Sequence, residues 1–338
     1  MANFQEVRLQ RGYAQLETAW GTVPNSSGAA TVTGSNAFGF QTSTMSQAQP
    51  ELNNPVKTGH LGQIDGQLGR RNSSSWQIDA PLIGSGSAGT VPDLDELYQC
   101  AMGKAAVIVP STSVTYGSDD NNYSVSLFDF VQPSTIEQRI FSGCIVTSME
   151  IAFGQDWSSV RFSGEGKSLI ESGFFSSLDV TGKSGLTAFP AEPASPTFAF
   201  NPILGHKGTI TLDSNPYTTL ISGSIKVDSG RLLPKNGWNS DYPIAPASGP
   251  RVVTLQWTMY DDDSVNLTAL KTKGRNSTAV TCSFALGTVA GNILTVTSRL
   301  KLGRPTYAED GPLRTVVFNA QGRMSGLASN DDISLAWT

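Results

Sequence analysis

The chain carries one order of elements twice, and this internal repeat limits the possible folds more than any other feature. Residues 37–166 and 219–322 each read as an apolar strand, a long polar loop, a strand with a tryptophan, a short helix and alternating strands that end in a glycine. The expected elements are strands 37–45 and 74–83 with helix 94–103 in the first copy, and strands 219–228 and 252–260 with helix 265–274 in the second. Two copies of one small domain predict an assembling structural protein more than an enzyme with one pocket.

Composition favours the same class. With 338 residues, of which 38% are apolar and 15% charged, the chain is long enough to bury two cores. Its 34 glycines, with many serines and threonines, favour turn-rich β structure over helix bundles. The predicted fold class is therefore mainly β (α+β): two tandem β-rich domains, each with a short helix, and long loops that are candidate interfaces.

The expected domain boundaries follow shifts in composition. Residues 1–36 are polar and then rich in Ser, Gly and Thr, which predicts an extended N-terminal arm ordered mainly by a neighbour. Residues 37–175 form the first predicted domain, and residues 203–338 form the second. The Pro-, Gly- and Ser-rich segment 176–202 between them is predicted to be a linker.

The strands predict a sheet with one apolar and one polar face. Residues 144–153 alternate between the two kinds of side chain and turn into residues 158–166, which predicts an antiparallel hairpin. Strand parity places four charged side chains on polar faces: Asp79, Glu150, Arg161 and Glu165. Such a sheet has a core side and a side that faces water or a channel.

Two motifs resemble ligand sites and are better explained as turns. Residues 84–89 match G-x-G-x-x-G, but Thr90, Val91 and Pro92 separate them from the helix and antiparallel hairpins surround them, which favours a strand-to-helix turn. The aspartates at 261–263 lack the spaced oxygen donors of a calcium loop and read as a solvated turn that caps a helix.

No residue pattern predicts catalysis, a metal or a cofactor. The two histidines, His60 and His206, lie far apart with no cluster of ligands or nucleophile beside them. The three cysteines, Cys100, Cys144 and Cys282, are expected to be buried thiols in a reducing compartment. A net charge of −5 argues against a surface that grips nucleic acid, and no apolar run predicts secretion or membrane insertion.

Four stretches carry a family resemblance: ETAWGTVP at 17–24, GRRNSSSW at 69–76, GTVPDLDEL at 89–97 and SGCIV at 142–146. Together they resemble the tail tube, or major tail, proteins of long-tailed non-contractile bacteriophages (siphophages). Residues 222–225 and 236–251 are similar to a second, more divergent copy of that tail tube domain. The resemblance implies a β-sandwich flanked by a helix, whose inner sheets join around a ring, with rings stacked into a tube.

The family implies a virion protein, assembled in the bacterial host cytoplasm, whose tube delivers double-stranded DNA without binding it specifically. Its implied partners are further copies of itself, the tape measure protein, and the tail-tip and terminator proteins. A duplicated subunit implies a trimeric, pseudo-hexameric ring, while a hexamer with a decorating second domain stays open. Carboxylates in the lumen would repel phosphate.

The resemblance also assigns roles to residues. Asp79, Glu150, Arg161 and Glu165 are candidates for the lumen, although the opposite sheet could line it instead. Loops 47–71 and 230–249 and the arm 1–36 are candidate interfaces. Their candidate contact residues are Trp20, His60, Arg70, Arg71, Trp238 and Tyr242.

Alternative functions remain open from the sequence. A baseplate or tail-completion protein with the same domain would form a single ring. A glycan-binding β-sandwich would use exposed Trp238 and Tyr242 as a sugar platform. A hydrolase is the weakest alternative, because neither histidine has a catalytic context.

Overall fold

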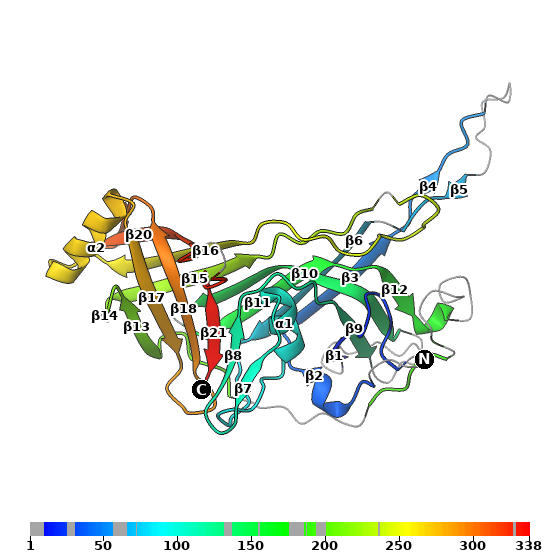
Figure 1. Ribbon diagram of the computed structural model, residues 1–338, viewed down its shortest axis with the longest axis horizontal. Coiled ribbons are helices and arrows are strands. Elements are labelled where there is room, and N and C mark those ends of the chain that lie inside the picture. Colours follow the sequence, from blue (N-terminus) through cyan, green and yellow to red (C-terminus); the bar gives the residue numbers. More distant parts are fainter. Residues whose placement is uncertain are drawn as a thin grey trace.

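The structure is a computed structural model that describes residues 10–25, 31–56, 66–71, 73–131, 137–154, 156–175, 186, 188–193, 201–235, 237–326 and 329–338. It is mainly β, with large antiparallel sheets and two α-helices. The chain forms two halves that lie side by side along the longest axis of the molecule (Figure 1). We call them the first half (β1 to β12) and the second half (β13 to β21).

The elements of the first half are β1 (Gln10–Leu16), η2 (Gly34–Asn36), β2 (Ala37–Phe38), β3 (Thr42–Ala48), β4 (Glu51–Leu52), β5 (Gln67–Leu68), β6 (Ser73–Pro81), α1 (Asp95–Met102), β7 (Val107–Val109), β8 (Ser113–Gly117), β9 (Val125–Val131), β10 (Arg139–Phe153), β11 (Ser159–Glu165), β12 (Ser168–Glu171) and η3 (Ser172–Phe174). Those of the second half are β13 (Gly208–Leu212), β14 (Asn215–Tyr217), β15 (Leu220–Asp228), β16 (Val252–Tyr260), α2 (Val265–Arg275), β17 (Ala279–Leu286), β18 (Leu294–Leu302), β19 (Thr306–Asp310), β20 (Leu313–Gly322) and β21 (Ser334–Trp337).

One long sheet runs through both halves. Its strands pair in the order β3, β6, β11, β10, β15, β16, β20, β19, and every pairing is antiparallel. The two halves meet where β10 pairs with β15 over six residue pairs, from Ser148 with Asp228 to Phe153 with Gly223. The sheet therefore joins the two segments of the chain that the predicted linker, residues 176–202, connects. Most residues of that linker lie outside the described ones.

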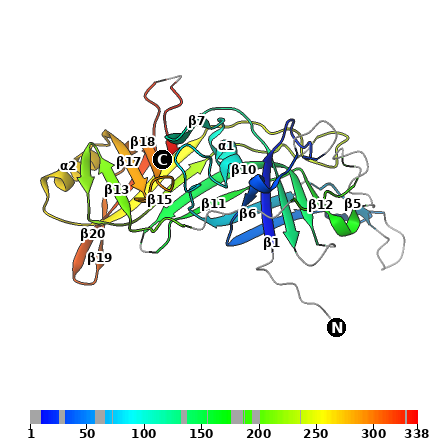
Figure 2. The ribbon, with the colours of Figure 1, turned by 90° about the horizontal axis from the view of Figure 1, so that it is seen from below.

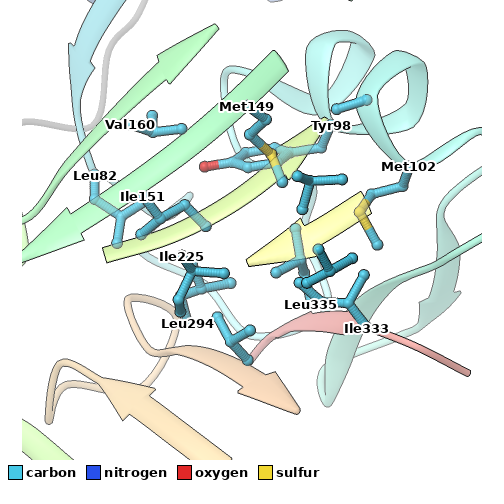
Figure 3. Close-up of a cluster of buried hydrophobic side chains, with 14 of the residues drawn as sticks. Leu82, Tyr98, Met102, Met149, Ile151, Val160, Ile225, Leu294, Ile333 and Leu335 are labelled. Atoms are coloured by element: carbon cyan, nitrogen blue, oxygen red, sulfur yellow. The ribbon is translucent and has the colours of Figure 1, made fainter. Parts of the chain in front are cut away.

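A second layer covers the apolar face of the long sheet. Over the first half it consists of β2, β1, β9, the start of β10, and β12. Over the second half it consists of β14, β13, β17, β18, β21, β8 and β7. Residues such as Met149, Ile151 and Ile225 fill the space between the layers as part of one core cluster drawn from both halves (Figure 3).

Strand β10 belongs to both layers of the first half. Its first residues pair with β9 and β12, and its last residues pair with β11 and β15. A β-bulge between Val146 and Ser148 marks the change, and Gly143 has a φ of 63° just before it. Bulges bend strands and increase their twist, so this strand can pass from one sheet to the other.

The two halves share one connectivity, element by element. Seven strands of the first half have one counterpart each in the second half: β1 and β13, β2 and β14, β3 and β15, β6 and β16, β9 and β17, β11 and β20, β12 and β21. The long strand β10 has two successive counterparts, β18 and β19. The sequence places the start of the repeat at residue 37 and an extended arm before it. The structure instead makes β1 a strand that pairs with β9 over seven residues and buries Tyr13 and Ala14.

Each half also has its helix close to where the sequence predicts it. α1 buries six of its eight residues, and Gly103 ends it in the left-handed region at a φ of 72°. α2 begins at Ser264, whose side chain accepts a hydrogen bond from the amide of Leu267, and it buries only Leu267, Leu270 and Gly274. The first helix is therefore enclosed, whereas the second lies largely open at the end of the molecule.

Candidate functional site: the polar face and open edges of the long sheet

A straight row of paired polar residues crosses the polar face of the long sheet. The strand registers align Thr42, Asp79, Arg161, Glu150 and Lys226 on β3, β6, β11, β10 and β15 in turn. Directly opposite residues on one face lie close enough for their side chains to interact. Three of the four predicted lumen residues thus belong to one row on one face.

The strongest contact in this row joins Asp79 and Arg161. Arg161 Nε lies 2.5 Å from Asp79 Oδ1, while Thr42 Oγ1 and Gln77 Nε2 donate to Asp79 Oδ2 at 2.7 and 2.9 Å. Burial raises the pKa of Asp79, but the hydrogen bonds from these three groups outweigh it and lower the pKa overall. The same contact raises the pKa of Arg161. The pair is therefore ionised at neutral pH.

The other acidic groups on this face also have basic neighbours. Glu150 lies opposite Arg161 on one side and opposite Lys226 on the other. Glu165, the fourth predicted lumen residue, accepts from Lys235 Nζ at 2.6 Å. Each of these acidic groups thus has a basic neighbour on the polar face. The alternation of Ser222, Ser224 and Lys226 in β15 is the sequence signal that could have added the basic members.

The long sheet ends in two open edges. Within the described residues β3 pairs with β6 alone, and β19 pairs with β20 alone. All five residues of β19 are exposed, and the hairpin of β19 and β20 projects at the end of the molecule opposite β5 (Figure 2). Open edges present unpaired backbone N–H and C=O groups to any strand that approaches.

Trp20, a predicted contact between subunits, lies against its own chain. Lys167 Nζ sits 4.7 Å from the centre of its ring. The neighbouring carboxylate of Glu17 accepts from the amides of Gly21 and Gly143 at 2.6 and 2.7 Å, and also from the hydroxyls of Ser124 and Ser126. The ETAWGTVP stretch therefore fastens the segment after β1 onto β10.

The remaining predicted contact residues fall in the two long loops. Arg70 and Arg71 lie at the base of an arm formed by β4 and β5, where Arg71 Nε donates to Gln49 Oε1 at 2.9 Å. The amide of Arg71 also donates to the carbonyl of Asp241 at 2.8 Å, so the two loops touch. His60 lies outside the described residues.

The loop between β15 and β16 separates its two aromatic residues. Trp238 is 95% exposed, but Tyr242 is only 7% exposed. The expectation that both form an exposed platform is wrong for Tyr242, because its side chain is buried. Sequence alone gives no signal here, since neighbours in a loop carry no periodicity.

The described residues hold few groups with metal-binding or reactive chemistry. They contain no group of three His, Cys, Asp or Glu residues that could hold a metal. Cys100, Cys144 and Cys282 are buried free thiols, as the sequence predicts, and burial raises the pKa of Cys282 to about 12. Neither helix in the described part of the chain is long and apolar enough to cross a membrane.

Comparison with known proteins adds no family assignment. Neither a scan against protein-family models nor a search of curated proteins found a match to this chain.

Proposed function

We propose that this protein is the tail tube subunit of a long-tailed bacteriophage, a non-enzymatic virion component that forms stacked rings through which DNA passes. The observation that carries the proposal is the pairing of β10 with β15. Within the long sheet, the edge strand of the first half's part, β10, there joins the edge strand of the second half's part, β15. The open edges β19 and β3 are the counterparts of β10 and β15, so the same joint can repeat between chains.

The internal joint also gives a register for the joint between chains. Met45, Trp76 and Gly164 are paired in a row in the first half, as are Ile225, Leu255 and Ala320 in the second. A glycine lies two residues after the row in both halves: Gly166, just after β11, and Gly322, at the end of β20. This agreement supports aligning the two rows. The register equates β15 with β3 at a shift of 180 residues, since 225 − 45 = 180.

Applying the register to the internal joint gives one specific pair. Ala152 pairs with Ser159 and with Ser224. The counterpart of Ala152 is Ala308, which pairs with Thr315, and the counterpart of Ser224 is Thr44. Ala308 of one copy would therefore lie opposite Thr44 of the next.

The stagger of the strands fits a closed barrel. The row of paired residues that starts at Thr42 on β3 ends at Lys226 on β15. The counterpart of Thr42 on β15 is residue 222, because 42 + 180 = 222. Crossing the four strands of one half therefore shifts the pairing along the strand by 226 − 222 = 4 residues. Four residues rise about 13 Å, and four strand spacings cover about 19 Å, which gives a tilt of about 35°. Closed barrels have strand tilts of this size. Three copies would supply 3 × 8 = 24 strands, with two equivalent sets of four from each chain.

The polar face would then line the channel. Paired charges such as Asp79 with Arg161 leave few free cations for phosphate to bind, so DNA could pass without being held. This role implies a place in the virion tail, with assembly in the host cytoplasm and contacts to tape measure, tail-tip and terminator proteins.

Negative-stain microscopy of the concentrated protein tests the proposal. Regular tubes with three-fold or pseudo-six-fold rings are expected. Closed single rings would instead favour a baseplate or tail-completion role, and monomers at every concentration would contradict assembly. The burial of Tyr242 leaves the glycan-binding alternative with Trp238 alone of its two aromatic residues.

A further inference from the structure

A groove of about 610 Å³ hollows the polar face of the long sheet in the second half. The strand registers carry the row of paired polar residues into this groove. Beyond Lys226 the row continues through Thr254 on β16 and Gln321 on β20, and it reaches Lys301 near the end of β18. The groove therefore lies on the face that the proposed function assigns to the channel.

Cations outnumber acids around this groove. Its cationic side chains are Lys226, Lys301 and Arg323, and all three are exposed. Glu150 is the one acid among its lining residues. Lys226 has acidic neighbours, since it lies opposite Glu150 and its Nζ is 3.0 Å from Asp228 Oδ1. Lys301 and Arg323 form no ion pair with any described residue, so their charges are available to a ligand.

The equivalent place in the first half has no such excess of positive charge. The alignment of the two halves equates residues 164 and 320, a shift of 320 − 164 = 156. It makes Glu165 the counterpart of Gln321 and Lys167 the counterpart of Arg323. Glu165 is paired with a lysine at 2.6 Å, and Lys167 Nζ lies over the ring of a tryptophan of its own half. In the second half the acid is replaced by an amide, which accepts from Arg323.

Uncharged hydrogen-bonding groups fill the space between the cations. Ser224, Gln256 and Asn319 line the groove and are paired in a second row, two residues along the strands from the first. Their hydroxyl and amide groups can donate to an anion. Guanidinium and ammonium groups bind phosphate oxygens through charge-assisted hydrogen bonds. The groove thus has the donors that a phosphate ester needs.

The width of the groove favours a polymer over a single ion. Lys226 and Lys301 are separated by three strand spacings, about 14 Å. Each strand of duplex DNA carries one phosphate per about 3.4 Å of helix axis, so about four phosphates cover this distance. The cations at the two sides of the groove therefore match a run of phosphates.

We propose that the groove binds the phosphodiester backbone of duplex DNA within the channel, an inference that rests on the proposed function. A ring of three chains would contact DNA at three grooves, separated by first halves in which pairs such as Asp79 with Arg161 leave phosphate without a free cation. Each groove supplies about two or three phosphate contacts, and such contacts weaken steeply as salt rises. The grooves would therefore slow the passage of DNA without stopping it.

Binding of a short labelled DNA duplex to the diluted full chain tests the groove without requiring tubes. Fluorescence anisotropy between about 50 and 200 mM salt should give a slope of log affinity against log salt of about −2 to −3. Lys301→Gln with Arg323→Gln removes the two cations that lack an acidic partner. This variant should lose about two units of that slope and at least about tenfold in affinity at low salt.

A second variant restores the arrangement of the first half. Gln321→Glu places a carboxylate between Lys301 and Arg323, and it should reduce the slope by about one. Lys104→Gln with Arg299→Gln is the matched control, because it removes two exposed cations that do not line the groove. The control should bind the duplex as the wild type does. Unchanged thermal melts check the fold of each variant.

The outcomes separate the groove from the proposed function. Equal losses in the groove and control variants would overturn the groove, and so would a wild type that binds polyglutamate but not the duplex. A wild type that forms tubes without binding the duplex would overturn the groove alone. Duplex binding that only the groove variants lose, by a protein that never forms tubes, would support the groove and contradict the proposed function.

Discussion

The joint inside the chain and the open ends of the same sheet differ in what surrounds them. Inside the chain, β10 meets β15 and a second pairing, β8 with β21, joins the halves in the outer layer. At the ends, β3 and β19 offer the same kind of edge without that second pairing in the described residues. The chain therefore contains, between its two halves, the kind of strand joint that we propose its ends make with another copy.

A buried ion pair lies beside the internal joint. Arg251 binds Asp332 through two hydrogen bonds of 2.9 Å and reaches the carbonyl of Asp119, while Ser118 donates to Asp332 at 2.6 Å. These contacts tie the loop after β15 and the C-terminal segment to the first half. The proposed joint between chains would form without these particular contacts beside it.

Breaking this ion pair should have the largest effect on stability. Both side chains are about 10% exposed, so Arg251→Ala leaves Asp332 buried without its partner. Removing one member of a buried pair costs about 3–5 kcal/mol. Urea unfolding of the variant measures this loss. A loss below about 1 kcal/mol would show that strand pairing alone holds the halves together.

The two helices predict the next effect, a pH dependence between about pH 5 and 8 that arises at the start of α1. Burial raises the pKa of Glu96 to about 7 and that of Asp93 to about 6 at the start of α1. α2 has no acidic residue in its first turn. A carboxyl whose pKa is higher in the folded state contributes stability that is present below its unfolded pKa and lost as pH rises through about 7.

Glu96→Gln isolates this effect because the amide keeps the oxygen that accepts from Asn36. The variant should differ little from the wild type at or below pH 4.5, the ordinary pKa of this side chain, and exceed it at pH 8 by up to about 3 kcal/mol. Urea midpoints from pH 4.5 to 8 give the measurement, with Asp262→Asn as the control. Equal pH profiles for wild type and Glu96→Gln would contradict a neutral carboxyl in the folded state.

Charge reversal on the polar face should convert a passive channel into a binding surface. Glu150→Lys places a third cation between Arg161 and Lys226, and Glu165→Lys removes the partner of Lys235. The double variant should assemble but retain DNA, with a slope of log affinity against log salt that steepens by about one per new phosphate contact. Co-sedimentation of tubes with duplex DNA measures retention. The neutral variant Glu150→Gln is the control, and unchanged retention in the double variant would argue against this face lining the channel.

The smallest effect is expected where the ion pair faces solvent. Arg161 is more than half exposed in its pair with Asp79, so Arg161→Ala should cost less than about 1 kcal/mol. Thermal unfolding compares this variant with Arg251→Ala. A loss as large as that of Arg251→Ala would mean that the face is not open to water.

Local periodicity accounts for the part of the fold that the sequence predicts. β11, β16 and both helices lie within one or two residues of their predicted bounds, because each has a regular apolar pattern. Strand β1 could not be predicted, because its sequence, QRGYAQL, does not alternate clearly and its partner, β9, lies more than 100 residues away. β7 was missed because three successive exposed apolar residues give no period.

The candidate site divides in the same way. Strand parity places Asp79, Glu150 and Arg161 on the polar face, which the registers agree with. Parity cannot give partners between distant strands, so Lys226 and Lys235 were missed. It also cannot reveal that β10 is followed in the sheet by β15, the pairing on which the proposed function depends.

Disulfide trapping at the predicted register tests the central claim most directly. Ala152→Cys with Ser224→Cys lies across the internal joint and should close within one chain, since directly opposed Cβ atoms lie about 4.5–5.5 Å apart and small shifts complete the bond. Ala308→Cys with Thr44→Cys is the equivalent pair at the open edges and should link separate chains into a covalently closed trimer. A hexameric circle would contradict the three-chain ring. Uncrosslinked monomers, under conditions where the internal pair closes, would contradict the account that the chain's ends repeat its internal joint.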